Sequence, residues 1–405
     1  MDTSNKNWFA LIAFFIIPIS GISVDIYLPS LPAISHYFDV DKSLAQLTVT
    51  AYMLGMGIMQ LFAGGISDSF GRKKPFLIAM ALFIVATLII PFSYDIYQLL
   101  FLRTVQGVLV AVIMVSIRSV IPDLFEGHRF NVMITYMVMA WSIGPIIAPA
   151  IGGYLQQYFG WQANFYFLAG YGLLAFLIVL IYLPETTRHY HPFHPAMIVK
   201  RYRKILSHKD FLSALIIDGL LYSLILLFAV LGPFLIQTGL HYSAVQFGHI
   251  ALLVGLAWFI GAMTSRLLVN IALDIKSKIC FWCMLFIALA MVAFSVTIST
   301  TIYSILCPLL LIVWLSGILF PRYASRAGSL FPENFGSANA LFGAFVFMIS
   351  GAGSALGSFL KSTSQLPLSI AYLSIIILCL SISYRIFRIH QPSIQPEPTL
   401  IIEED

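Results

Sequence analysis

The chain has 405 residues, of which 60% are hydrophobic and only 10% are charged, and its formal net charge is +5. A water-soluble domain carries about 25% charged residues, so this composition and the mean hydropathy of +0.93 exclude a soluble globular protein. The apolar runs are about 20 residues long, which fits helical membrane spans and not the ~10-residue strands of a membrane barrel. We therefore predict an all-α polytopic membrane protein.

The apolar runs, counted between charged or Pro- and Asn-rich breaks, predict twelve transmembrane helices. They cover residues 9–33, 44–65, 75–93, 97–121, 131–155, 164–183, 211–235, 244–268, 279–299, 302–320, 335–359 and 367–384. The hydrophilic stretch 184–210 separates two sets of six, a plan typical of transporters built from two pseudo-symmetric bundles. The predicted domains are a six-helix bundle at 1–183, a basic linker at 184–210, a second bundle at 211–384 and a disordered tail at 385–405.

Lys and Arg predict how the chain is oriented, because basic residues are enriched in cytoplasmic loops. With the N-terminus inside, 19 of the 22 basic residues fall on the cytoplasmic side; the exceptions are Lys42, Lys361 and Arg103. Both termini, the linker and the tail are therefore expected in the cytoplasm. The positive charge is thus a topology signal, and no nucleic-acid partner is expected. The four cysteines fall in or beside spans, and we predict neither a metal site nor a cofactor.

The first span contains Asp25, and the fourth contains Arg103 with Gln106 one turn later. Ionisable groups inside spans are costly and usually face a cavity or a partner. Counted from the external loops at ~1.5 Å per residue, Asp25 and Arg103 reach compatible depths. We expect Asp25 to carry a proton that couples transport, with Arg103 and Gln106 tuning it. The alternative is a fixed structural ion pair.

The loop between the second and third spans reads GGISDSFGRKK over residues 64–74. Its glycines, Gly64 and Gly71 among them, permit a tight turn. Asp68 and Arg72, followed by Lys73, offer a local ion pair at a helix end. Either this segment acts as a conformational latch, or it is a cytoplasmic charge cluster without that role.

The fifth span contains a glycine- and proline-rich stretch over residues 144–153, GPIIAPAIGG. Small residues allow helices to approach closely, and proline bends a helix by removing a backbone donor. We expect a hinge or sealing role here, with generic small-residue packing as the alternative. The residues concerned are Gly144, Pro145, Pro149, Gly152 and Gly153.

A cavity for amphipathic solutes would be lined by apolar and aromatic side chains. Our candidates are Tyr27, Met114, Met137, Trp141, Tyr222 and Trp314. Without information on which way they face, each of them either lines the cavity or touches lipid or a neighbouring helix. Two more polar residues lie within spans: Asp218 has either a coupling role or access to cytoplasmic water, and His249 either titrates or packs.

Four of these stretches together resemble the major facilitator superfamily. The loop at 64–74 is similar to its G-x-x-x-D-x-x-G-R-[RK] signature, and 103–107 (RTVQG) and 144–153 resemble two motifs of its drug:proton antiporter branch. Residues 23–32 (SVDIYLPSLP) resemble the first span of the bicyclomycin and chloramphenicol resistance exporters. In that family the loop aspartate contacts the N-terminus of span eleven, which here would begin near Phe335 with Glu333 and Asn334 as its cap.

The resemblance implies a proton antiporter that exports small amphipathic organic molecules or drugs across a bacterial inner membrane by alternating access, working as a monomer. Its partners would be a small-molecule substrate, protons and the lipid bilayer. A carrier of an endogenous metabolite or siderophore is the nearest alternative. An intramembrane enzyme fits less well because no catalytic cluster appears, and a channel fits less well because no repeated pore loop or charge ring appears.

Overall fold

The computed structural model describes residues 3–187, 190, 194–297, 299–331, 335–360 and 364–389, and every regular element within them is a helix. Twelve helical segments there are long and apolar enough to cross a membrane, as predicted. The first span contains α1 (Thr3–Ile16), α2 (Ile19–Asp25), η1 (Leu28–Ser30) and α3 (Leu31–Tyr37). The other elements of the first half are α4 (Lys42–Phe70), α5 (Lys73–Ile89), η2 (Ile90–Phe92), α6 (Ile96–Leu124), α7 (Gly127–Phe159) and α8 (Gln162–Tyr182).

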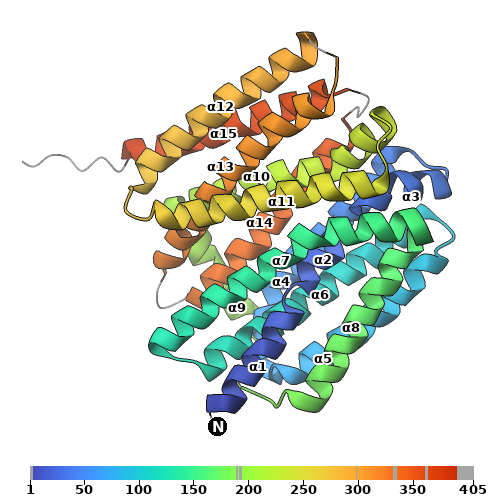
Figure 1. Cartoon of the computed structure of the whole chain (residues 1–405). Helices are drawn as coiled ribbons and strands as arrows, with labels where there is room; N and C mark the ends of the chain where they lie inside the picture. The colour runs from blue at the N-terminus through green and yellow to red at the C-terminus, as the bar shows by residue number, and fades with distance from the viewer. Residues whose placement is uncertain are drawn as a thin grey trace, which may run out of the picture.

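After α9 (Pro195–Leu206), a short helix in the predicted linker, six further spans follow. They are α10 (Lys209–Pro233) with the π-helix η3 (Phe234–Gly239), α11 (Ala244–Leu267), α12 (Leu273–Thr297), α13 (Ile302–Ser329), α14 (Phe335–Ser358) and α15 (Leu366–Ile389). Figure 1 shows α1–α8 gathered on one side of the molecule and α10–α15 on the other. The start of α1 and the end of α15 lie at the same end of the bundle, which we call the terminal end.

The first span is broken where its prolines fall. Pro18 follows the end of α1, and Pro29 lies in η1, one turn after Asp25. Proline has no N–H, so Pro29 cannot donate to the carbonyl of Asp25, four residues earlier, as a regular helix would require. The α-helix accordingly ends at Asp25. This residue therefore lies at a break inside a membrane span, and not in the middle of a continuous helix.

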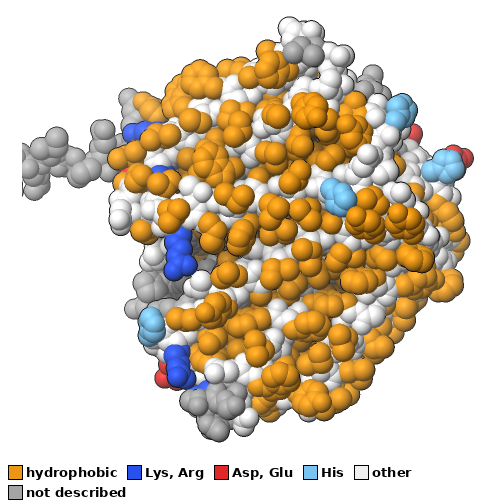
Figure 2. All heavy atoms as spheres, in the orientation of Figure 1, with side chains coloured by type: hydrophobic (Ala, Val, Ile, Leu, Met, Phe, Trp, Pro, Cys, Tyr) orange, Lys and Arg blue, Asp and Glu red, His pale blue; other side chains and the backbone are white. Residues whose placement is uncertain are grey.

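The surface of both halves is apolar along the length of the helices. Figure 2 shows hydrophobic side chains covering this face, while the basic side chains in view cluster at the terminal end. Exposed residues include Phe101, Ile181, Phe286 and Leu356, each with more than half of its surface accessible. An apolar surface of this extent is stable in contact with lipid and not with water, in agreement with a multi-pass membrane protein.

At the end opposite the termini, hydrogen bonds join the two halves; we call this the closed end. The bonds are Gln46 Nε2 to Val230 O (3.0 Å), Gln237 Nε2 to Pro29 O (2.9 Å) and Val245 N to Gln157 Oε1 (3.4 Å). At the terminal end, α9 contacts both halves, because Tyr202 donates to Leu61 O (2.9 Å) and Arg201 to Ser337 Oγ (3.0 Å). These bonds tie the halves directly at the closed end, and α9 bridges them at the terminal end.

Candidate functional site

A cavity lies between the two halves, enclosed by α7 from the first half and by α10 and α11 from the second, with the first span contributing Asp25 and Leu28. In this conformation the cavity has a volume of about 80 Å³, within about 790 Å³ of space between atoms that includes its open mouth. Most of its lining is aliphatic or aromatic, and Asp25 is the one charged residue among the lining residues. Such a surface suits an amphipathic molecule with one polar or cationic group.

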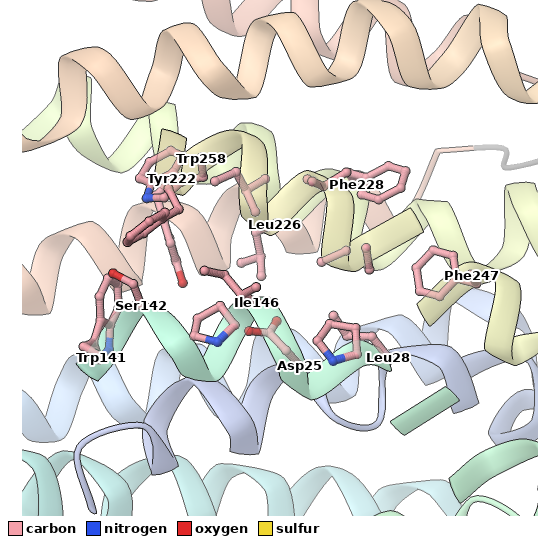
Figure 3. Close-up of a pocket in the computed structure, with 18 residues that line it drawn as sticks. Asp25, Leu28, Trp141, Ser142, Ile146, Tyr222, Leu226, Phe228, Phe247 and Trp258 are labelled. Carbon is pink, nitrogen blue, oxygen red and sulfur yellow. The ribbon is translucent and has the colours of Figure 1, made fainter. Parts of the chain in front are cut away.

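Asp25 reaches this cavity because α2 ends there. Its side chain is partly accessible and projects into the space bounded by Ile146, Leu226 and Leu28 (Figure 3). Arg103 lies close enough to act on Asp25 electrostatically. In the described part of the chain, however, no ion pair within 4.0 Å joins the two residues. The carboxyl therefore remains available to a ligand in the cavity.

Arg103 lies behind Asp25, completely buried in the first half. One guanidinium nitrogen donates to Ser23 O (3.1 Å) and to Gln106 Oε1 (2.8 Å). The guanidinium carbon lies 4.2 Å from the ring centroid of Tyr27 and 4.5 Å from that of Tyr52, as in a cation–π contact. The structure thus places Arg103 and Gln106 in contact, and the arginine is held by aromatic rings and oxygen atoms and not by Asp25 directly.

Two of the six predicted cavity residues line the cavity, namely Trp141 and Tyr222. Trp141 is fixed by a hydrogen bond from its indole N–H to Ser20 Oγ (3.1 Å). The other four lie elsewhere. Tyr27 is buried against Arg103, Met114 is buried in the core, Met137 packs against that core, and Trp314 donates to Thr264 Oγ1 (3.3 Å). These four residues do not line the cavity in the conformation described, and composition does not reveal which side of a helix faces it.

The sequence did not identify several residues that do line the cavity. Trp258 and Phe259 on α11 and Phe228 on α10 contribute aromatic surface from the second half. The ring centroids of Trp258 and Tyr222 are 6.3 Å apart in an edge-to-face arrangement. Trp258 at mid-span was the available signal, since a bulky aromatic away from the membrane interface is a candidate for a binding cavity.

The loop between α4 and α5 forms a charged cluster at the terminal end. Arg72 contacts Asp68 Oδ1 (2.5 Å), Ser67 Oγ (3.0 Å) and Asp123 Oδ2 (3.0 Å). These contacts raise the pKa of Arg72 above its ordinary value, although burial alone would lower it. Asp123 also accepts from Thr186 Oγ1 (2.9 Å). Sequence reasoning did not place Asp123 in this cluster.

Glu185, which follows α8, closes the same loop. Its carboxylate accepts from the backbone N–H groups of Arg72 (2.9 Å) and Lys73 (3.1 Å). Burial alone would raise the pKa of Glu185, but these backbone donors and that of Thr187 hold the pKa below its ordinary value. Gly71 has φ +88°, and a side chain on it would meet the Glu185 carboxylate. Position 71 therefore requires glycine both for its positive φ and for the space that the Glu185 carboxylate occupies.

The proposed contact of Asp68 with the start of the eleventh span falls on residues 332–334, which lie outside the described residues. Within them, α14 packs along α4: Thr50 and Ser354 share a hydrogen bond of 3.0 Å, and Gly57 lies against the backbone of α14. Gly64 has open space where a Cβ would be, so its role is not close packing.

The glycines of the fifth span make close backbone contacts. A Cβ on Gly144 would lie 2.7 Å from Pro18 O, and one on Gly152 would collide with Ile26 O, both on the first span. Gly153 faces the other half, where a Cβ would lie 2.6 Å from Ala244 O. The same short stretch thus packs on the first span and on the second half.

The same stretch of the fifth span also forms part of the cavity wall, because Pro145 and Pro149 line the cavity.

The remaining predicted polar residues, Asp218 and His249, do not line the cavity. Asp218 is fully buried in the second half, and His249 is exposed, 3.2 Å from Tyr154 Oη.

Comparison with known proteins identifies the family. The Major Facilitator Superfamily model matches residues 13–358. A bicyclomycin resistance protein homolog from Haemophilus influenzae is 25% identical over 357 residues, covering 85% of this chain and 87% of the relative. Multidrug resistance protein D from Escherichia coli is 27% identical over 370 residues, covering 88% and 89%.

Solved structures show the same fold. A bacterial homolog of the human lysosomal transporter Spinster, in an inward-facing and occupied conformation, has a TM-score of 0.74 at 12% identity and covers 96% of this chain and 98% of its own. A D-xylose–proton symporter has a TM-score of 0.73 at 14% identity and covers 92% and 97%. The chain, a membrane transporter with twelve spans, belongs to the Major Facilitator Superfamily.

Proposed function

We propose that this transporter is a proton antiporter that exports small amphipathic organic molecules, drugs among them, by alternating access. One observation carries the proposal: the cavity between the halves is apolar and aromatic, and its single charged lining residue, Asp25, has no ion-pair partner within 4.0 Å in the described chain. The names of the relatives, which concern resistance to bicyclomycin and to multiple drugs, support the same substrate class.

Coupling follows from competition for one carboxyl. A cationic or hydrogen-bonding substrate and a proton both use Asp25, so the two exclude each other in the cavity. Arg103, fixed behind it by Ser23 and the rings of Tyr27 and Tyr52, keeps a positive charge near the carboxyl without occupying it. Inward movement of protons through this site then permits outward movement of substrate.

The orientation completes the proposal. We place the terminal end, with α9 and both termini, in the cytoplasm and the closed end at the periplasm of a bacterial inner membrane, because most Lys and Arg residues fall at the terminal end. The hydrogen bonds from Gln46, Gln237 and Gln157 then seal the periplasmic side. This conformation accepts substrate from the cytoplasm, and the protein works as a monomer.

Two further segments serve the conformational change. The cluster of Asp68 and Arg72 acts as a latch at the cytoplasmic side, with Gly71 and Lys73 shaping the turn that Glu185 binds. Gly144, Gly152 and Gly153 act as the hinge and seal of the fifth span, since they keep its backbone against the first span and the second half.

The test uses purified protein in liposomes with tetraphenylphosphonium, a lipophilic cation, as the probe. An imposed pH gradient should drive concentrative uptake by the wild type. Asp25→Asn, which keeps the side-chain shape, should abolish the concentrative step while leaving exchange of labelled for unlabelled probe.

Asp274→Asn, at the start of α12 and away from the cavity, is the matched control and should behave as the wild type. Concentrative uptake by Asp25→Asn at the wild-type rate would contradict the proposal. Metabolite profiling of cells that lack or overproduce the protein distinguishes drugs from an endogenous metabolite or siderophore as the main cargo.

A further inference from the structure

A second carboxyl lies inside the membrane-spanning part, on α10. Asp218 has no exposed surface, and neither of its carboxyl oxygens has a hydrogen-bond partner. The three ion pairs found among the described residues do not include it. An unsatisfied ionisable group within a span is costly and is usually kept for a function.

The groups that face Asp218 from neighbouring helices carry no compensating charge. The titratable side chains that it influences electrostatically are Tyr323 on α13 and Cys379 on α15, which are both neutral at neutral pH. The Tyr323 hydroxyl donates to Ser277 Oγ (2.8 Å) and lies 3.4 Å from Ser383 Oγ, so it is already engaged.

Two further residues on α10 supply no counter-ion to Asp218. The position next to Asp218 is Gly219, where a Cβ would press against the side chain of Ile349 on α14. The acidic residue two turns earlier on α10, Asp210, pairs with Arg326 at 3.4 Å. A carboxylate at position 218 would therefore be a buried charge with no hydrogen-bond or ion-pair partner among the described residues, whereas the neutral acid needs no counter-ion.

The same helix connects Asp218 to the transport cavity. Tyr222, one turn further along α10, lines the cavity opposite Trp141 and Ser142, as Figure 3 shows. The contact between α10 and α14 is close because each helix contributes a glycine: Gly219 lies against the side chain of Ile349, and Gly353 lies against that of Ser223. A shift of α10 along this contact changes the cavity wall and the surroundings of Asp218 together.

We propose that Asp218 is a second proton-binding site of the transport cycle, distinct from Asp25. It holds a proton in the conformation described here and releases it to water when α10 moves in the opposite conformation. The step forms and breaks one carboxyl O–H bond by exchange with water, and no other reactant is needed. The inference rests on the proposed proton antiport and adds that two carboxyls, one in each half, take part.

The first experiment probes the wild-type protein directly. Dicyclohexylcarbodiimide adds to carboxylic acids in apolar surroundings, and mass spectrometry locates the product. In liposomes turning over tetraphenylphosphonium, we expect modification of Asp218 at acidic pH that decreases at alkaline pH, and none of the control residue Asp274. Absence of modification at Asp218 at both pH values, while Asp25 is modified, would overturn the inference.

The second experiment counts protons moved per tetraphenylphosphonium. Replacement of one of two proton-binding residues should lower the ratio from about two in the wild type and in Asp274→Asn to about one in Asp218→Asn. An unchanged ratio in Asp218→Asn would refute the second site. Should Asp218→Asn fail to fold, the wild-type modification decides the question.

A wild-type flux that moves no protons would instead contradict the proposed function. The pH-dependent modification of Asp218 would still test whether this residue binds a proton, because the modification does not require proton movement to be coupled to substrate transport. The two failures are therefore distinguishable.

Discussion

Removing Asp123 should destabilise the protein more than removing Asp68, although Asp68 is the acidic residue that the loop motif singles out. Both carboxylates bind Arg72, whose side chain is only 13% exposed. The Asp68 side chain is 49% exposed, whereas that of Asp123 is 17% exposed and also accepts from Thr186. The structure therefore assigns the larger stabilisation to Asp123.

The magnitudes follow from exposure. An ion pair with one partner half in water contributes at most about 1 kcal/mol. Asp123 accepts two hydrogen bonds in a mostly buried setting, and bonds involving a charged group are worth about 1.5–3 kcal/mol each. When Asp123 is removed, Arg72 keeps its hydrogen bonds to Asp68 and Ser67. We therefore expect Asp123→Ala to lower the free energy of unfolding by about 2–3 kcal/mol, within the range of such contacts.

The assay is equilibrium unfolding of purified Asp68→Ala, Asp123→Ala and Arg72→Ala in mixed micelles, with the Arg72→Ala/Asp123→Ala double variant closing a thermodynamic cycle. A coupling energy of about 1–3 kcal/mol between Arg72 and Asp123 is expected. If Asp68→Ala lowered the free energy of unfolding as much as Asp123→Ala, the reasoning from exposure would be wrong.

Three further outcomes are expected. The pKa of Glu185 is held below its ordinary value, so the stabilisation from this carboxylate is present above about pH 4.5 and is lost as the pH falls through the lowered pKa. The melting temperature of Glu185→Gln should therefore depend less on pH in acid than that of the wild type. An unaltered dependence would count against this contact. Gly152→Val should cost about 1–3 kcal/mol by forcing α7 away from Ile26 O, and wild-type unfolding and transport in that variant would show that the close contact is dispensable. Arg103→Lys should lower the free energy of unfolding by about 1–2 kcal/mol, because an ammonium does not reproduce the stacking of the guanidinium over Tyr27. Equilibrium unfolding of this variant tests the prediction, and a stability equal to that of the wild type would contradict it.

Much of the fold could be predicted because the bilayer constrains each span separately. Twelve apolar runs sufficed to predict twelve spans. The short break between the predicted spans 75–93 and 97–121 is present in the structure, where Asp95 accepts a hydrogen bond from Gln98 N (2.6 Å) at the start of α6. Hydropathy does not reveal internal breaks, so the division of the first span at Pro18 and Pro29 went unpredicted.

The candidate site was only partly predictable, because it depends on which side each helix presents. Arg103 and Gln106 are three residues apart on one helix, so local geometry brings them together. The cavity wall instead depends on how α7, α10 and α11 are rotated, which explains why Trp141 and Tyr222 were found while Trp258 was missed. The partners of Arg72 likewise come from distant segments, and no spacing in the sequence indicates Asp123 or Glu185 as its neighbours.

The central claim is that a proton and the substrate compete for Asp25. The most direct measurement is the affinity of the purified protein for tetraphenylphosphonium as a function of pH, in the wild type and in Asp25→Asn. Wild-type affinity should fall on acidification, by up to about tenfold per pH unit for one competing proton, while the variant should bind weakly and independently of pH. A wild-type affinity that does not change with pH, or a variant that keeps the wild-type pH dependence, would contradict the account.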